Sequence, residues 1–154
     1  MKDTMKNKLF ALSWDNPTDV QLKSIHAIVE DDDFDPALLL PHNIPKECFR
    51  NASIILAKWG SPRIDSVILG LFKWLQDLNW PGAIEVLVLL YDLPKEKTEK
   101  PLQDAITEAK RTNDLGWLEF IEYYTNREKH EPEIRRALEE RRKKIADSFG
   151  GIYP

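Results

Sequence analysis

Apolar residues recur every three to four positions along most of the chain, which is the period of an α-helix that buries one face. The segments that carry such a stripe are residues 17–30, 45–59, 62–76, 98–113, 115–124 and 131–149. No segment alternates between apolar and polar residues over the length of a β-strand. The pattern therefore predicts an all-α protein.

Two of the segments differ from the others in the width of their apolar face. Residues 80–93 are apolar nearly all round, with Glu85 as the only charge before Asp92. Such a helix is usually buried on several sides, so we expect it at the centre of the packing. Residues 131–149 keep only a narrow apolar stripe. This charged C-terminal segment is therefore predicted to be an edge helix.

Prolines and glycines lie between the helical segments rather than inside them, and they indicate where helices begin and end. Asn16 is predicted to cap a helix that starts at Pro17, and Ser61 to cap one that starts at Pro62. About six to seven helices with short connections result, and such helices pack antiparallel. The sequence thus predicts a single domain over residues 1–154, built as a short stack of antiparallel helix pairs of the α-solenoid type.

The stretch KWLQDLNWPGA, residues 73–83, holds two of the five tryptophans. One interpretation is a tight corner between helices. Asp77 or Asn79 would cap the next helix, Trp80 would fix its entry angle, and Gly82 would allow a close approach. The other interpretation is a binding site, an aromatic patch at a helix end. Its candidate residues are Trp74, Gln76, Asp77, Asn79 and Trp80.

Three sequence blocks, WDNPTDVQLKSI, RNASIILAKWG and WLQDLNWPGA, resemble a family of uncharacterised bacterial proteins that is described as a domain of unknown function. The resemblance covers about residues 12–124, and its specific part is the tryptophan-rich motif. Phe49 stands where the family carries a tryptophan. The resemblance implies HEAT-like helical repeats and carries over no activity. Some members look like companions of toxin systems.

Charge is unevenly distributed along the 154 residues, whose net charge is −4. Residues 127–144 hold eight Lys or Arg against five Glu, so the rest of the chain carries −7. The negative charge of the chain outside residues 127–144 argues against binding to the phosphate backbone of nucleic acids and favours a basic protein partner. The candidate contacts are the acidic residues of one turn, Asp31, Asp32, Asp33 and Asp35.

Motifs of known chemistry are missing from the sequence. Cys48 is the only cysteine, which excludes an intrachain disulfide and a cysteine-cluster metal site, and His26, His42 and His130 are isolated. We therefore expect no catalytic residues, no metal and no cofactor. The longest apolar run is far below the roughly 20 residues that span a bilayer, and the first residues lack the apolar core that a secretory signal needs. The expected location is the cytoplasm, without membrane attachment.

These observations favour a non-catalytic protein-interaction module, of which an immunity-type protein that binds a toxin is one concrete form. The alternative is a HEAT-like nucleic-acid binder or DNA-repair enzyme, in which the tryptophans and Asp77 would contact a nucleic-acid base. The acidic composition disfavours that alternative. The sequence leaves the oligomeric state open.

Overall fold

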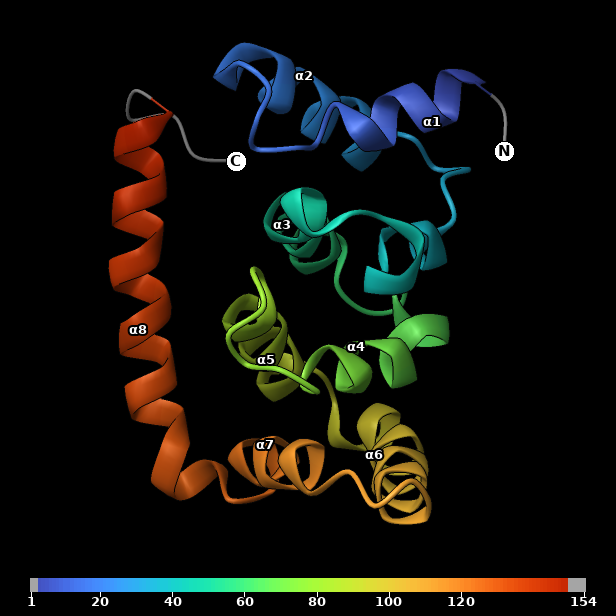
Figure 1. Ribbon diagram of the computed structural model, residues 1–154, viewed down its shortest axis with the longest axis vertical. Helices are drawn as coiled ribbons and strands as arrows, with labels where there is room; N and C mark the ends of the chain where they lie inside the picture. The colour runs from blue at the N-terminus through green and yellow to red at the C-terminus, as the bar shows by residue number, and fades with distance from the viewer. Residues whose placement is uncertain (1–2, 150–154) are drawn as a thin grey trace.

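The structure is a computed structural model that describes residues 3–149, and within this range its regular structure is entirely helical (Figure 1). The α-helices are α1 (Asp3–Phe10), α2 (Thr18–Val29), α3 (Phe49–Trp59), α4 (Ile68–Trp74), α5 (Ala83–Asp92), α6 (Lys95–Arg111), α7 (Leu115–Thr125) and α8 (Arg127–Ser148). Short 3₁₀ helices are η1 (Pro36–Leu39), η2 (Pro41–Asn43), η3 (Lys46–Cys48) and η4 (Asp65–Val67). The all-α prediction is confirmed.

The helices from α3 onward form three rows (Figure 1). Helices α3, α5 and α7 form the middle row, in which α5 contacts both of the others. Helices α4 and α6 pack against each other on one side, and α8 runs along α5 and α7 on the other. Helix α2 packs on α3, and α1 packs on α2.

Helix α5 occupies the centre of the molecule, as its apolar sequence predicts. All its residues from Glu85 to Tyr91 are buried, because α3 and α4 cover one part of its surface and α8 covers another. Burying a large apolar side chain stabilises a fold by about 1.5–3 kcal/mol. Helix α5 therefore contributes much of the hydrophobic stabilisation of the domain.

Helix α8 is an edge element that three arginines hold against α5. Arg127 Nη2 donates to the carbonyl of Tyr91 at 3.0 Å, and Arg135 Nη2 lies 2.6 Å from Asp92 Oδ1. Arg141 Nη1 lies 3.3 Å from Glu85 Oε2, whose side chain is almost completely buried. The narrow apolar stripe of α8 supplies the remaining contacts through Ile134, Leu138 and Ile145.

Two helix starts differ from the sequence-based expectation. Asn16 does not cap α2. Its Nδ2 instead donates to the carbonyl of Phe10 at 2.9 Å, and Pro17 occupies the N-cap position. Ser61 precedes a cis peptide bond to Pro62, and α4 begins only at Ile68 after the turn η4. In both places a side chain that could cap a helix binds a different group.

The expectation that prolines and glycines lie only between helices is wrong for four helices, since Gly70 lies inside α4 and Gly116 inside α7, and α6 and α8 each contain a proline. Pro101 lies inside α6 and Pro132 inside α8. A proline inside a helix removes one backbone hydrogen bond. In α6, Thr98 and Ala105 are both buried, so packing on either side of Pro101 keeps the helix continuous. The helix α1 was not predicted either, because its lysines leave only a short apolar stripe.

Candidate functional site

The corner between α4 and α5 contains the tryptophan-rich stretch, and Trp74 is its structural centre. The Trp74 side chain is 0% exposed, and its Nε1 donates to the carbonyl of Pro81 at 3.2 Å across the corner. Its ring meets the ring of Phe49 on α3 edge to face, with 5.7 Å between centroids. The structure therefore places Trp74 in the core rather than at a surface.

Asp77 and Asn79 form the turn itself. Asp77 Oδ1 accepts a hydrogen bond from the backbone N–H of Asn79 at 2.8 Å, the geometry in which a short side chain stabilises a turn. Neither residue caps α5, because Gly82 holds the N-cap position with φ of 82°. The prediction that Asp77 or Asn79 caps α5 is thus wrong. The N-cap position of α5 instead requires a residue with a left-handed backbone, which is Gly82.

Gly82 brings the corner against α3. A Cβ at this position would lie 2.9 Å from the carbonyl oxygen of Phe49 and 2.8 Å from Ser53 Oγ. The expected close approach at Gly82 is therefore confirmed.

Gly82→Ala is expected to lower the free energy of unfolding by about 2 kcal/mol, because both the left-handed backbone and the contact with α3 oppose a methyl group. Gly116→Ala is the control, because Gly116 lies inside α7, is exposed, and a Cβ there would meet no atom closer than 3.7 Å. Alanine is favoured over glycine inside a helix, so this variant should not lower the free energy of unfolding. Urea unfolding of both variants measures the difference. A Gly82→Ala variant as stable as the wild type would show that neither the backbone nor the contact with α3 opposes a methyl group.

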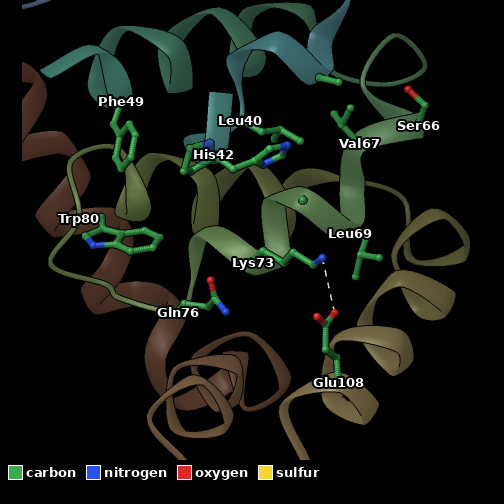
Figure 2. A pocket seen from close by; sticks show the side chains of 13 residues that line it. Leu40, His42, Phe49, Ser66, Val67, Leu69, Lys73, Gln76, Trp80 and Glu108 are labelled. Atoms are coloured by element: carbon green, nitrogen blue, oxygen red, sulfur yellow. Dashed lines mark ion pairs between the residues drawn. The ribbon is translucent and has the colours of Figure 1, made fainter. Parts of the chain in front are cut away.

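A groove lies beside this corner, and we call it the α4 groove (Figure 2). Its volume is about 750 Å³. Its lining residues are Ala37, Leu40, Pro41, His42, Phe49, Ser66, Val67, Leu69, Gly70, Lys73, Gln76, Trp80 and Glu108. Two of the predicted binding residues, Gln76 and Trp80, are among them, whereas Trp74, Asp77 and Asn79 are not.

The walls of the α4 groove are mainly apolar. Phe49 and Trp80 face one another at one end, with ring centroids 5.9 Å apart, and Leu69 and Val67 lie toward the other (Figure 2). Gly70 lies under Leu40, because a Cβ there would come within 2.5 Å of Leu40 Cδ1. The groove thus runs from an aromatic end to an aliphatic end.

Lys73, Gln76 and Glu108 form a polar rim on one side of the groove, and His42 lies on the other (Figure 2). Lys73 Nζ lies 3.5 Å from Glu108 Oε2, which links α4 to α6 (Figure 2). Their side chains are 45% and 36% exposed, so water screens the pair and it contributes at most about 1 kcal/mol. An apolar floor with a polar rim is the usual composition of a protein-binding surface.

The acidic turn is a separate, ordered feature. Asp31 Oδ1 accepts from the N–H of Asp33 at 3.0 Å, and Asp35 Oδ1 accepts from the N–H of Ala37 and caps η1. Asp32 is fully exposed and lies 3.8 Å from Arg63 Nη1. Arg63 also stacks on the ring of Trp59, 3.9 Å from its centroid. The turn joins the α4 groove through Ala37.

Two reactive side chains outside the groove, Cys48 and His130, are buried or paired. Cys48 is buried, its Sγ lies 3.4 Å from the carbonyl of Leu9, and burial raises the pKa of its thiol to about 11. His130 Nε2 lies 3.0 Å from Glu122 Oε2, and its ring packs on Tyr123. Among residues 3–149, no three His, Cys, Asp or Glu side chains come together in a way that could hold a metal ion. None of the described helices combines the length and apolar character needed to cross a bilayer.

Sequence reasoning did not identify most of the groove. Leu40, Phe49 and Leu69 come from three segments that only the fold brings together. One weak signal was present in the sequence: Leu69 lies off the buried stripe of its helix, which consists of Ile68, Leu71, Phe72 and Trp74. A single apolar residue outside the stripe indicates a binding surface only when the fold places it in a larger apolar patch.

The chain belongs to the family DUF5071, a domain of unknown function, whose model matches residues 44–149. The matched range begins within the groove-lining segments and includes α8. Neither the curated proteins nor the solved structures include a match to this chain.

Proposed function

We propose that this member of the DUF5071 family is a non-catalytic protein-interaction module that holds a segment of another protein in the α4 groove. The observation that carries the proposal is the groove itself, about 750 Å³ of open space between apolar walls. Phe49 and Trp80 meet at one end of it. Aromatic residues in partly enclosed positions contribute most of the binding free energy at protein interfaces.

The shape of the groove favours a protein segment as the ligand. Its walls come from η1, η2, α3, η4, α4, α6 and the corner before α5, so it extends over several elements rather than closing around one point. Grooves of this kind bind amphipathic helices or extended segments that insert apolar side chains. The half-exposed rim pair Lys73 and Glu108 can orient such a segment without a large desolvation cost.

We also propose that the fold is a short HEAT-like stack that works in the cytoplasm. The packing of alternate helices supports the stack, because α3 packs on α5 and α4 packs on α6 in neighbouring rows. The single cysteine suits a reducing compartment. An immunity-type protein that neutralises a toxin is one concrete form of the proposed module. In that form the toxin supplies the bound segment.

The proposal is tested by blocking the groove at Gln76, an exposed lining residue. Gln76→Tyr places a bulky side chain at the rim and removes no core contact. Gln103→Tyr is the matched control, since Gln103 is also exposed but lines no part of the groove. Tagged wild-type and variant proteins are expressed at native levels in the source organism, and the proteins that copurify are compared by quantitative mass spectrometry.

We expect a partner that copurifies with the wild type and with Gln103→Tyr and is depleted at least tenfold with Gln76→Tyr, which corresponds to about 1.4 kcal/mol of lost binding free energy. Circular dichroism of both variants checks that the fold is intact. A partner retained equally by the two variants, or the absence of any partner, would overturn the proposal.

A further inference from the structure

The charges that line the α4 groove cancel. Lys73 and Glu108 are the only lysine, arginine, aspartate or glutamate among its lining residues, and they form an ion pair with each other. A charged segment would therefore meet no net charge of opposite sign in the groove. An uncharged segment needs none, because its contacts are apolar or hydrogen-bonded. The lining thus favours an uncharged occupant.

Three polar side chains of the lining have no partner inside the described protein. His42, Ser66 and Gln76 are exposed, and their side chains form neither a hydrogen bond nor an ion pair with another group of residues 3–149. Gln76 and His42 lie on opposite sides of the groove (Figure 2). The amide of glutamine carries two N–H donors, and an imidazole carries at least one. Donors are therefore available on both sides of the apolar floor.

These donors distinguish three kinds of bound segment. A β-strand binds by pairing its backbone with the edge of a sheet, and residues 3–149 contain no sheet. An α-helix uses its backbone groups internally, so it would leave the donors on both sides bonded to water. A polyproline II segment has no internal hydrogen bonds, and its carbonyls are free to accept them. The polyproline II segment therefore fits both the floor and the two sides.

The aromatic end of the groove provides a surface for proline rings. Trp80 is half-buried, and its ring meets the ring of Phe49 edge to face. Proline-rich segments dock on grooves lined by aromatic side chains, because the segment is already extended before it binds and loses little entropy. The aliphatic end, which includes Leu69, can hold an aliphatic side chain of the same segment.

We propose that the segment bound in the α4 groove is uncharged, rich in proline and in the polyproline II conformation. Its prolines pack on Trp80 and Phe49, and an aliphatic side chain packs on Leu69. Gln76 and His42 donate hydrogen bonds to its carbonyls from the two sides. This inference rests on the proposed function and adds the chemistry and the conformation of the partner.

The test uses three fluorescein-labelled peptides without charged side chains. The first is Ser-Pro-Pro-Leu-Pro-Pro-Leu-Pro-Pro-Ser, and the second carries alanine in place of every proline. The third is a helix of about 16 residues, built from alanine and glutamine, with two leucines four positions apart. Binding to the full chain is measured by fluorescence anisotropy at low salt and in about 0.5 M NaCl.

We expect the first peptide to bind at least roughly fivefold more tightly than either of the others, because it is extended before it binds. Added salt should change its Kd by less than about twofold, because the charges of the groove cancel.

Two variants locate the contacts on the two sides of the groove. Gln76→Leu and His42→Phe each remove the donors and keep a side chain of similar size. Gln103→Leu and His26→Phe are the matched controls, since both residues are exposed and line no part of the groove. Each groove variant should bind the first peptide about two- to tenfold more weakly, the effect of one lost hydrogen bond. Each control should change the Kd by less than about twofold, because it removes no contact.

The results that would overturn the inference differ from those that would overturn the groove itself. Tighter binding of the helical peptide, or equal binding of the first two peptides, contradicts the polyproline II segment. Equal losses in the groove variants and their controls also contradict it, as does the absence of binding of the first peptide up to about 1 mM. After any of these results, the groove as a protein-binding site is still judged by the copurification with Gln76→Tyr, which does not depend on the conformation of the partner.

Discussion

Trp74→Ala is expected to lower the free energy of unfolding by about 3–5 kcal/mol, the usual cost of removing a fully buried large aromatic side chain. The Trp74 side chain is 0% exposed and contacts Phe49 edge to face. Its indole also donates the only side-chain hydrogen bond described for the carbonyl of Pro81. A domain of this size has roughly 5–15 kcal/mol of stability, so the variant is expected to be close to unfolding. Urea unfolding followed by far-UV circular dichroism measures the loss.

Two further variants separate the causes of this loss. Trp74→Phe keeps most of the packing and leaves the carbonyl of Pro81 without its partner, and it should cost about 1–3 kcal/mol. Trp14 is the control, because it is 38% exposed. Trp14→Ala should cost about 1 kcal/mol or less. If Trp74→Ala and Trp14→Ala were equally stable, Trp74 would not be the centre of the corner.

Arg141→Met is expected to destabilise the protein by about 2–4 kcal/mol, because it leaves the charge of Glu85 buried without a partner. The Glu85 side chain is only 4% exposed, and Arg141 Nη1 lies 3.3 Å from one of its oxygens. Methionine keeps most of the aliphatic contact of the arginine, so the loss reports on the charge. The expected cost lies below that of a fully enclosed pair because Arg141 itself is 36% exposed. Urea unfolding measures it.

The double variant Arg141→Met with Glu85→Gln should regain most of the lost stability, since no buried charge remains. Arg142→Met is the matched control for the arginine substitution. Arg142 is exposed on the next position of α8, and its replacement should change stability by about 0.5 kcal/mol or less. A double variant as unstable as Arg141→Met alone would mean that the arginine acts through its packing.

The helical pattern of the sequence predicts much of this fold for a physical reason. In α5 and α8 the width of the apolar face alone distinguishes a central helix from an edge helix, and the burial of Val86 and Leu90 against the exposure of Glu133 and Glu140 agrees with that distinction. Helix ends are predicted less well. Asn16 and Ser61 are both able to cap a helix, and their real partners, Phe10 and Asp65, depend on the tertiary fold.

The candidate site was predictable only in part. The motif around Trp80 carries a local signal, because tryptophan, glycine and proline close together indicate a corner with an aromatic side chain. Leu40 and Leu69 carry no such signal together, since they line one groove only because the fold packs Leu40 against Gly70 of α4. A surface formed by distant segments depends on packing geometry, which one sequence does not encode locally.

The position of the family match relative to the α4 groove has a consequence for related proteins. The matched range begins at residue 44, so Ala37, Leu40, Pro41 and His42 lie outside it, while the opposite wall and Trp80 lie inside. The family model thus covers the aromatic end and the rim pair but not the wall that residues 37–42 form. In a protein that shares the matched range but differs before residue 44, a groove at this place would have a different second wall and therefore a different width.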